Sequence, residues 1–225
     1  MSAEPAVAVG QPEPDRRARR RQESIDEILA TAVEVMAEVG AGGLNLGEVA
    51  RRVGVRPPSL YQYFPSKSAI YDEVFARGWR DLEQHLRAFD RAAGPVTSAD
   101  GARDRLCKGS VAFVRWAIDH PVQSQLMFWR PVPGFEPSPE AFAPALGLME
   151  LTRSTLAGFV AAGWLRPEAA EDDAVRAQTT AISGVISQQL SNDPAAGFDD
   201  GVYTRLIPLL IDMFFDHYST RKDRP

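Results

Sequence analysis

Apolar side chains recur at intervals of three and four residues along most of the chain, the spacing that places them on one face of an α-helix. The clearest stripe predicts a first helix from about Arg17 to Val39, ended by Gly40. Its apolar positions are Ile25, Ile28, Leu29, Ala32, Val35, Met36 and Val39. No segment alternates convincingly as a strand would, and there is no internal repeat. The pattern therefore predicts an all-α fold of about nine helices.

The later part of the chain continues the helical pattern. Helices are expected over residues 66–89, 102–120, 122–129, 138–162, 167–190 and 198–218. The second of these contains the run VAFVRWAI, which is apolar almost all round, so this helix should be central in its domain. Pro208 lies within the last one and should kink it or shift its start. The run RPVPGFEPSPE between two helices predicts a stiff surface loop.

Residues 45–67, NLGEVARRVGVRPPSLYQYFPSK, indicate two short helices joined by a tight turn. Asn45 is a good N-cap, and Glu48 stands three residues later, where its side chain can return to the cap N–H. Gly54 can adopt the left-handed conformation that ends a helix. A proline is tolerated in the first helical turn, so Pro57 marks the start of the second helix.

The second of these helices has an outer side that a buried helix would not need. Leu60 and Phe64 anchor it at i and i+4, which leaves the other side chains outside: Ser59, Tyr61, Gln62 and Tyr63. Two helices joined by a short turn containing Gly form the helix-turn-helix unit, whose second helix enters the DNA major groove. An ordinary helical hairpin is the commoner structure, but it has no use for two outward tyrosines and a glutamine.

This part of the chain resembles the N-terminal domain of TetR-type transcriptional regulators over about residues 20–80. The resemblance rests on Gly40, on EVARRVGV at 48–55 and on SLYQYFPSK at 59–67. It implies a dimeric regulator, a repressor rather than an activator, that binds a palindromic operator and responds to a ligand. Gly47 stands where some members carry a base-reading side chain, so the operator sequence does not follow.

Specific roles can be predicted for the outward residues. Tyr61 and Lys67 should bind backbone phosphates, and the resemblance implies the same for Asn45 at a helix N-terminus. Arg56 would suit guanine and Gln62 adenine. The full set predicted to lie on DNA is Asn45, Arg56, Pro58, Ser59, Tyr61, Gln62, Tyr63 and Lys67, with Arg19 and Arg20 from the basic run RRARRR.

The net charge of −5 is unevenly distributed. Residues 1–67 hold nine basic and nine acidic side chains, whereas the remainder holds 16 basic and 21 acidic ones. An acidic body with a locally basic end fits DNA binding, because only the contacting face must be positive. The basic run at 16–21 is expected to be an arm that contacts phosphates, with a solvated tail as the alternative. Residues 1–15 are expected to be a disordered tail.

Residues 16–66 are expected to form the DNA-binding domain, and residues 67–220 a ligand-binding and dimerisation domain. The second domain is rich in large apolar side chains that predict a pocket: Trp79, Phe113, Trp116, Met127, Phe128, Phe142 and Met149, with His120 and Gln125 as polar groups. Core packing is the alternative, and for most of them the commoner role. Because 111–118 and 122–129 lack Asp and Glu, we expect a hydrophobic ligand that is neutral or weakly anionic.

The last two helices, at Ala174–Leu190 and Val202–Tyr218, are expected to form the homodimer interface. Small or neutral residues follow one flank of the first: Ala174, Gln178, Ala181, Gly184 and Ser187. A dimer also fits DNA recognition, because one short helix reads too few bases to be selective.

Several other functions are disfavoured. The single cysteine, Cys107, and three widely separated histidines predict no metal site and no cofactor. No phosphate-binding loop, GxSxG elbow or HExxH motif is present, so we do not expect an enzyme. No run is long enough to span a bilayer and the first residues do not resemble a signal peptide, so a cytoplasmic protein is expected. The alternative is a helical interaction module that has lost DNA binding, which would have no reason to keep Tyr61, Lys67 and the basic run.

Overall fold

The computed structural model describes residues 16–220, and within that range it is built from helices. The α-helices are α1 (Arg16–Val39), α2 (Leu46–Val53), α3 (Pro57–Leu60), α4 (Lys67–Ala92), α5 (Ala99–Asp119), α6 (Pro121–Trp129), α7 (Pro139–Ala161), α8 (Asp172–Asn192) and α9 (Ile207–Tyr218). Short 3₁₀ turns are η1 (Ala41–Gly43), η2 (Pro167–Ala170) and η3 (Thr204–Leu206). The predicted all-α fold is confirmed for this range, with one isolated β-bridge. The predicted tail, 1–15, lies outside the described residues.

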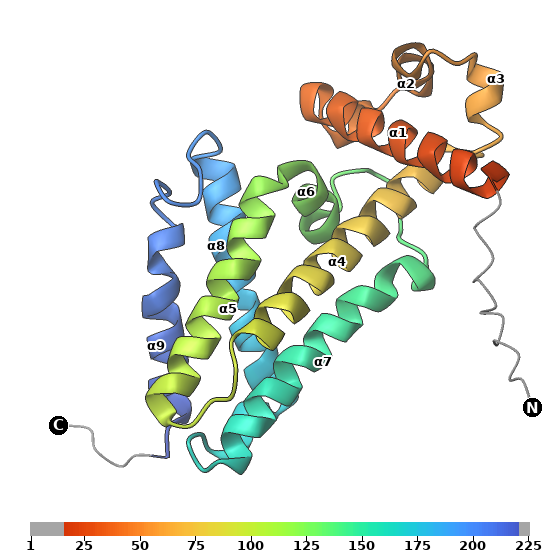
Figure 1. Ribbon diagram of the computed structural model, residues 1–225. Coiled ribbons are helices and arrows are strands. Elements are labelled where there is room, and N and C mark those ends of the chain that lie inside the picture. The colour runs from red at the N-terminus through yellow and green to blue at the C-terminus, as the bar shows by residue number, and fades with distance from the viewer. Residues whose placement is uncertain (1–15, 221–225) are drawn as a thin grey trace, which may run out of the picture.

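Helix α4 connects the two ends of the molecule. Helices α1 to α3 form a unit at one end, and α4 starts there and runs between α5 and α7, while α8 and α9 lie on the far side (Figure 1). The Tyr71 hydroxyl of α4 donates to the Ala41 carbonyl oxygen at 2.6 Å. One turn and a half further on, Arg77 pairs with Asp26 of α1 at 2.6 Å. The first half of α4 is therefore bound to the N-terminal unit by polar contacts as well as by packing.

The local signals around α2 are confirmed except for one half of the capping box. The Asn45 side-chain oxygen accepts from the N–H groups of Gly47 and Glu48 at 2.8 and 3.4 Å. Gly54 ends the helix with a φ of 77°. The Glu48 carboxylate does not return to the cap N–H; it accepts instead from two arginines of its own helix. Strong charge-assisted bonds at i+3 and i+4 outcompete a single neutral N–H.

Helix α3 is shorter than predicted. It begins at Pro57, as expected, but it ends at Leu60 rather than near Phe64. The chain continues as hydrogen-bonded turns, in which the N–H groups of Tyr63 and Phe64 both donate to Leu60 O at 3.0 Å. Phe64 precedes Pro65, whose ring disfavours helical backbone at the residue before it.

The last two predicted helices both begin later than expected. The segment predicted as one helix from Pro167 forms η2 and an extended Glu171 before α8 starts at Asp172, where two acidic residues favour a helix N-terminus. Helix α9 begins at Ile207, so Pro208 falls in its first turn. Of the two expected effects of Pro208, a kink or a shifted start, the structure shows the shifted start. Across residues 16–220, none of the helices combines the length and apolar character needed to cross a membrane.

The proline-rich segment, residues 130–140, is more firmly packed than a surface loop. Phe135 is buried, and its ring lies 5.5 Å from that of Tyr71, measured between centroids. The segment therefore covers the beginning of α4 and leads directly into α7.

Candidate nucleic-acid interface and internal cavity

A shallow depression lies where the N-terminal ends of α2 and α4 meet. Asn45, Tyr61 and Lys67 line it together with Gly47 and Ser66. The three residues predicted to bind phosphates thus come from three separate segments and share one surface site. Free N–H groups and the helix dipoles favour an anion at such a position.

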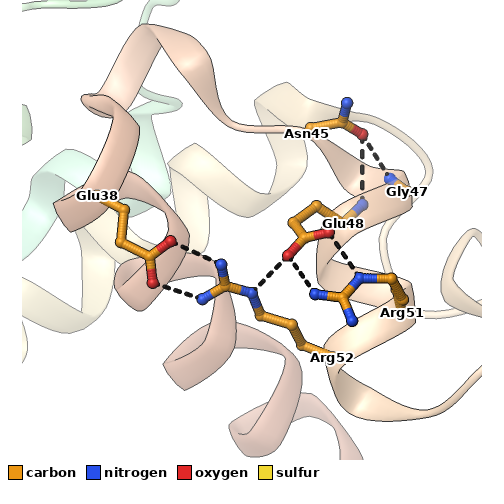
Figure 2. A network of polar contacts seen from close by, with 6 residues as sticks. All are labelled: Glu38, Asn45, Gly47, Glu48, Arg51 and Arg52. Carbon is orange, nitrogen blue, oxygen red and sulfur yellow. Dashed lines mark hydrogen bonds and ion pairs between the residues drawn. The ribbon is translucent and has the colours of Figure 1, made fainter.

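The Asn45 amide is fixed in orientation. Because its oxygen accepts from two N–H groups of α2, its nitrogen points away from the helix (Figure 2). A Cβ atom on Gly47 would lie 3.1 Å from the Asn45 oxygen, which is tighter than an ordinary contact. A glycine at this position therefore leaves room for the cap, and the Asn45 nitrogen remains available as a donor.

Two arginines of α2 are held by carboxylates (Figure 2). Arg51 donates to both Glu48 oxygens at 2.8 and 2.7 Å, and Arg52 bridges Glu48 and Glu38 at 2.6 to 2.7 Å. Hydrogen bonds from Arg51, and then from Arg52, lower the pKa of Glu48 to about 2. Those from Arg52 also lower the pKa of Glu38. These contacts join α2 to α1, so much of the positive charge of both arginines is already paired.

The base-reading candidates are the N-cap of α3, a residue of the helix itself and two residues of the turn after it. Arg56 and Gln62 are exposed, whereas Ser59 and Tyr63 are half-buried; Pro58, also expected to lie on DNA, is exposed. The Arg21 guanidinium lies over the Tyr63 ring, 5.2 Å from its centroid.

Comparison with known proteins identifies the family to which this arrangement belongs. Residues 28–74 match the bacterial regulatory proteins of the tetR family, and residues 108–213 match the tetracyclin repressor-like C-terminal domain. The chain belongs to the TetR family.

The relatives are distant. The HTH-type transcriptional regulator Mb1846 of Mycobacterium bovis is 28% identical over 131 residues, which cover 56% of this chain and 54% of that protein. The tetracycline repressor protein class C of Escherichia coli is 37% identical over 49 residues, 22% of each chain. The chain thus spans about half the length of the curated relative Mb1846.

Solved structures show the same fold over a longer stretch. A protein of unknown function from Rhodococcus sp. RHA1 is similar with a TM-score of 0.69 and 21% identity, covering 88% of this chain and 96% of that one. The TetR family transcriptional regulator PfmR from Thermus thermophilus has a TM-score of 0.62 and 18% identity, with 87% and 99% covered.

In this TetR family member the basic run at 16–21 is not an arm ahead of the first helix. It forms the opening turns of α1, where Arg19 lies 3.7 Å from Glu23. Arginine is a good helix former, and an i, i+4 pair of opposite charges supports the helix. The sequence-based set contained Arg19 and Arg20 but not Arg21, which is exposed and whose guanidinium lies over the Tyr63 ring.

The aromatic set predicted to form a pocket is mostly core packing. Trp79 lies between the rings of Phe75 and Phe128, with centroid distances of 6.2 and 5.5 Å. Trp116 stacks on His120 at 4.5 Å, and the His120 Nδ1 atom is 2.8 Å from the Trp116 carbonyl oxygen. Trp79 and His120 therefore pack on neighbouring rings, and Trp116 also borders a separate depression with Arg77 and Gln123.

The other members of that set are placed differently again. Phe142 and Met149, both on α7, are 42% and 37% exposed, and the Phe142 ring stacks on Phe75 of α4 with centroids 6.0 Å apart. Met127 is buried against Gly78, and Gln125 is half-buried on α6. Phe113, by contrast, lines a cavity between α4, α5, α7 and α8.

That cavity has a volume of about 130 Å³. Leu86, Phe89, Leu106, Leu151 and Ile182 supply apolar walls. The polar lining groups were not predicted as ligand residues: Asp90, Arg105, Ser110, Thr152, Thr155, Gln178, Thr179 and Ser183. One feature of the sequence could have indicated this polar lining. Gln178 places an amide within an apolar stripe, because it falls between Ala174 and Ile182 at helical spacing.

The far side of the molecule carries an exposed apolar stripe. Val202, Leu206, Leu209 and Met213 are 44%, 39%, 56% and 61% exposed along the approach to α9 and on α9 itself. On α8, a Cβ atom added to Gly184 would meet nothing within 4 Å. Two residues expected on the interface flank, Ala174 and Gln178, are instead buried inside the subunit.

Proposed function

We propose that the protein is a sequence-specific DNA-binding transcriptional regulator, a repressor that acts as a homodimer and releases its operator when a small molecule fills the cavity. The observation that carries the proposal is the gathering of Asn45, Tyr61 and Lys67 in one depression beside the exposed residues of α3. Membership of a family of regulatory proteins supports it.

Three donors of the depression suit one DNA backbone. The Asn45 nitrogen, the Tyr61 hydroxyl and the Lys67 ammonium would bind phosphate oxygens and so fix α3 against the major groove. Arg19 and Arg20, exposed at the start of α1, would contact flanking phosphates. These contacts position the protein without reading sequence.

Sequence reading is assigned to the exposed side chains of α3 and its following turn. Arg56 would bind guanine and Gln62 adenine, because their donor and acceptor patterns match those base edges. Ser59 and Tyr63 would supply further contacts, with Pro58 packed against the base edges.

The regulatory domain, proposed as residues 67–220, would form the dimer through the stripe on α9 and the open side of α8. Four exposed apolar side chains in one stripe are costly to leave in water, and a second copy of the chain would bury them. A two-fold dimer matches a palindromic operator. Regulation of DNA places the protein in the cytoplasm, where the bacterial chromosome lies.

Ligand control requires different affinities for two conformations. A molecule that binds better to the DNA-incompetent form shifts the population away from operator binding. Helix α4 would carry the movement, since it lines the cavity at Leu86 and is bonded to the N-terminal unit at Tyr71.

The test is selection from a random DNA library with the purified chain, followed by titration of the enriched sequence. We expect a palindrome bound by a dimer, with weaker binding to a shuffled sequence. If no DNA sequence is enriched, and any residual DNA affinity does not depend on salt concentration, the alternative of a helical interaction module without DNA binding is favoured.

A further inference from the structure

Four of the hydroxyl groups that line the cavity between α4, α5, α7 and α8 are hydrogen-bond acceptors whose own proton is already used. Ser110 Oγ donates to Leu106 O at 2.8 Å. The three threonine hydroxyls donate to carbonyl oxygens four residues earlier in the same helix: Thr152 to Leu148 at 3.1 Å, Thr155 to Leu151 at 2.8 Å, and Thr179 to Val175 at 2.9 Å. A hydroxyl that has donated its single proton can only accept.

Gln178 adds one more acceptor to this set, and its contact with Ser110 fixes the orientation of its amide group. Its side chain nitrogen lies 3.4 Å from Ser110 Oγ. Because the Ser110 proton goes to Leu106, Ser110 can only accept from Gln178, so the amide nitrogen faces Ser110 and the amide oxygen faces away.

The Gln178 oxygen has no donor within the described residues, although the residue is only 8% exposed. This oxygen is also not fully enclosed by protein. Among the described residues, the one side-chain polar atom that is both fully enclosed and without a partner is Trp79 Nε1. Because Gln178 lines the cavity and its nitrogen is turned to Ser110, the cavity is the space that its open oxygen can reach. A buried carbonyl without a partner costs free energy that a donor on a ligand would recover.

The charged lining groups cancel each other. Arg105 donates to Asp90 at 2.8 Å and to the carbonyl oxygen of Gly94, so its positive charge is already paired with a carboxylate. A carboxylate ligand would bring a second negative charge beside Asp90 and only further acceptors for the hydroxyl oxygens.

The volume limits the size of the guest. A cavity of about 150 Å³ in another protein accommodates benzene, and this one has about 130 Å³. The apolar walls suit one ring or a short branched chain.

We propose that the cavity binds a small, uncharged, mostly apolar molecule through an O–H or N–H group that donates to Gln178 and to the neighbouring hydroxyl oxygens. This inference rests on the proposed function only in treating the cavity as the effector site; the chemistry of binding can be measured without DNA.

The experiment uses three probes of nearly equal shape, observed by fluorine NMR on the full chain: para-fluorophenol, para-fluorotoluene and para-fluorobenzoate. We expect the phenol to bind about tenfold more tightly than the toluene, the worth of one well-placed hydrogen bond, and the benzoate to bind most weakly. Gln178→Leu should abolish the preference for the phenol. Gln84→Leu, the same change on the exposed side of α4, should leave it intact.

Thr155→Val, a nearly isosteric change, serves as a second variant if Gln178→Leu does not fold; it should reduce the same preference. Absence of binding by all probes, equal binding of phenol and toluene, or an unchanged preference in both cavity variants would overturn the proposal. If the phenol preference holds but no DNA sequence is selected, the cavity chemistry stands and the regulatory function fails.

Discussion

Asp72 and Ser138 join α4 to the start of α7 through two hydrogen bonds. The Ser138 N–H donates to one Asp72 carboxylate oxygen and the Ser138 hydroxyl to the other, both at 2.7 Å. The same Ser138 oxygen caps α7 by accepting from Ala141 N at 3.1 Å. Next to Asp72, Tyr71 bonds to the N-terminal unit. Adjacent residues of α4 therefore hold the two parts of the molecule that a ligand signal would have to connect.

Ser138→Ala removes both the cap and one bond to a carboxylate. We expect the free energy of unfolding to fall by about 3 kcal/mol, the sum of about 1 kcal/mol for a cap and about 2 kcal/mol for a hydrogen bond to a charged group. Urea unfolding would measure it. Ser98→Ala is the matched control, because Ser98 caps α5 through Gly101 without a carboxylate partner. It should cost about 1 kcal/mol; an equal loss in the two variants would show that the Asp72 bond contributes nothing.

Lys67→Ala should weaken binding to a selected operator and to unrelated DNA by similar factors. Loss of one phosphate contact should also reduce the slope of log affinity against log salt by about 1. Titration by fluorescence anisotropy at several salt concentrations would measure both effects. Lys108→Ala, which removes an exposed lysine on α5, is the control and should change neither. Unchanged affinity and slope for Lys67→Ala would exclude the phosphate role.

Gln62→Ala should behave differently from Lys67→Ala. If Gln62 reads an adenine, the loss of about 1 to 3 kcal/mol should be confined to sequences that carry that base, with relaxed selectivity at one operator position. Competition with single-base operator variants would test this. A uniform loss on all sequences would contradict a reading role for Gln62.

Leu209→Glu combined with Met213→Glu should dissociate the dimer. Both side chains are more than half exposed in the single chain, and two carboxylates facing their copies across a two-fold axis would repel each other. Sedimentation at micromolar concentration would report a monomer with weak operator binding. Leu146→Glu with Met149→Glu, on the exposed side of α7, is the matched control and should remain dimeric. A dimer that survived the α9 changes would place the interface elsewhere.

Glu48→Gln should lower thermal stability in a way that depends on pH. The arginines depress the pKa of Glu48 from 4.5 to about 2, so its ionised form stabilises the fold above the unfolded pKa. That stabilisation is lost as the pH falls through the folded value. The gap in melting temperature between wild type and Glu48→Gln should be full near about pH 7 and shrink towards about pH 3. Glu34→Gln, on the exposed side of α1, should show a smaller gap. A difference in melting temperature that does not change with pH would mean that the shape of the Glu48 side chain, rather than its charge, accounts for the lower stability of Glu48→Gln.

Local features could be read from the sequence because their causes lie within a few residues. The cap at Asn45, the left-handed Gly54 and the start of α3 at Pro57 all follow from backbone geometry and neighbouring side chains, and all three are confirmed. The apolar stripe of α1 is confirmed from Ile28 to Met36, whereas Val39, expected to belong to it, is 57% exposed at the end of the helix. The roles predicted for the DNA-facing residues remain predictions, although the structure brings the phosphate set together.

Only the tertiary structure decided which side of each later helix faces the core, the cavity or the surface. The run at 111–118 of α5 is apolar nearly all round, so its sequence could not say that Phe113 borders the cavity while Trp116 packs on His120. On α8, small and polar residues were assigned to a dimer flank, yet Gln178 lies inside the subunit because α5 and α7 pack against that side. Periodicity determines that a helix has a buried face, whereas the identity and spacing of the helices packed on that face determine whether it becomes core, interface or cavity.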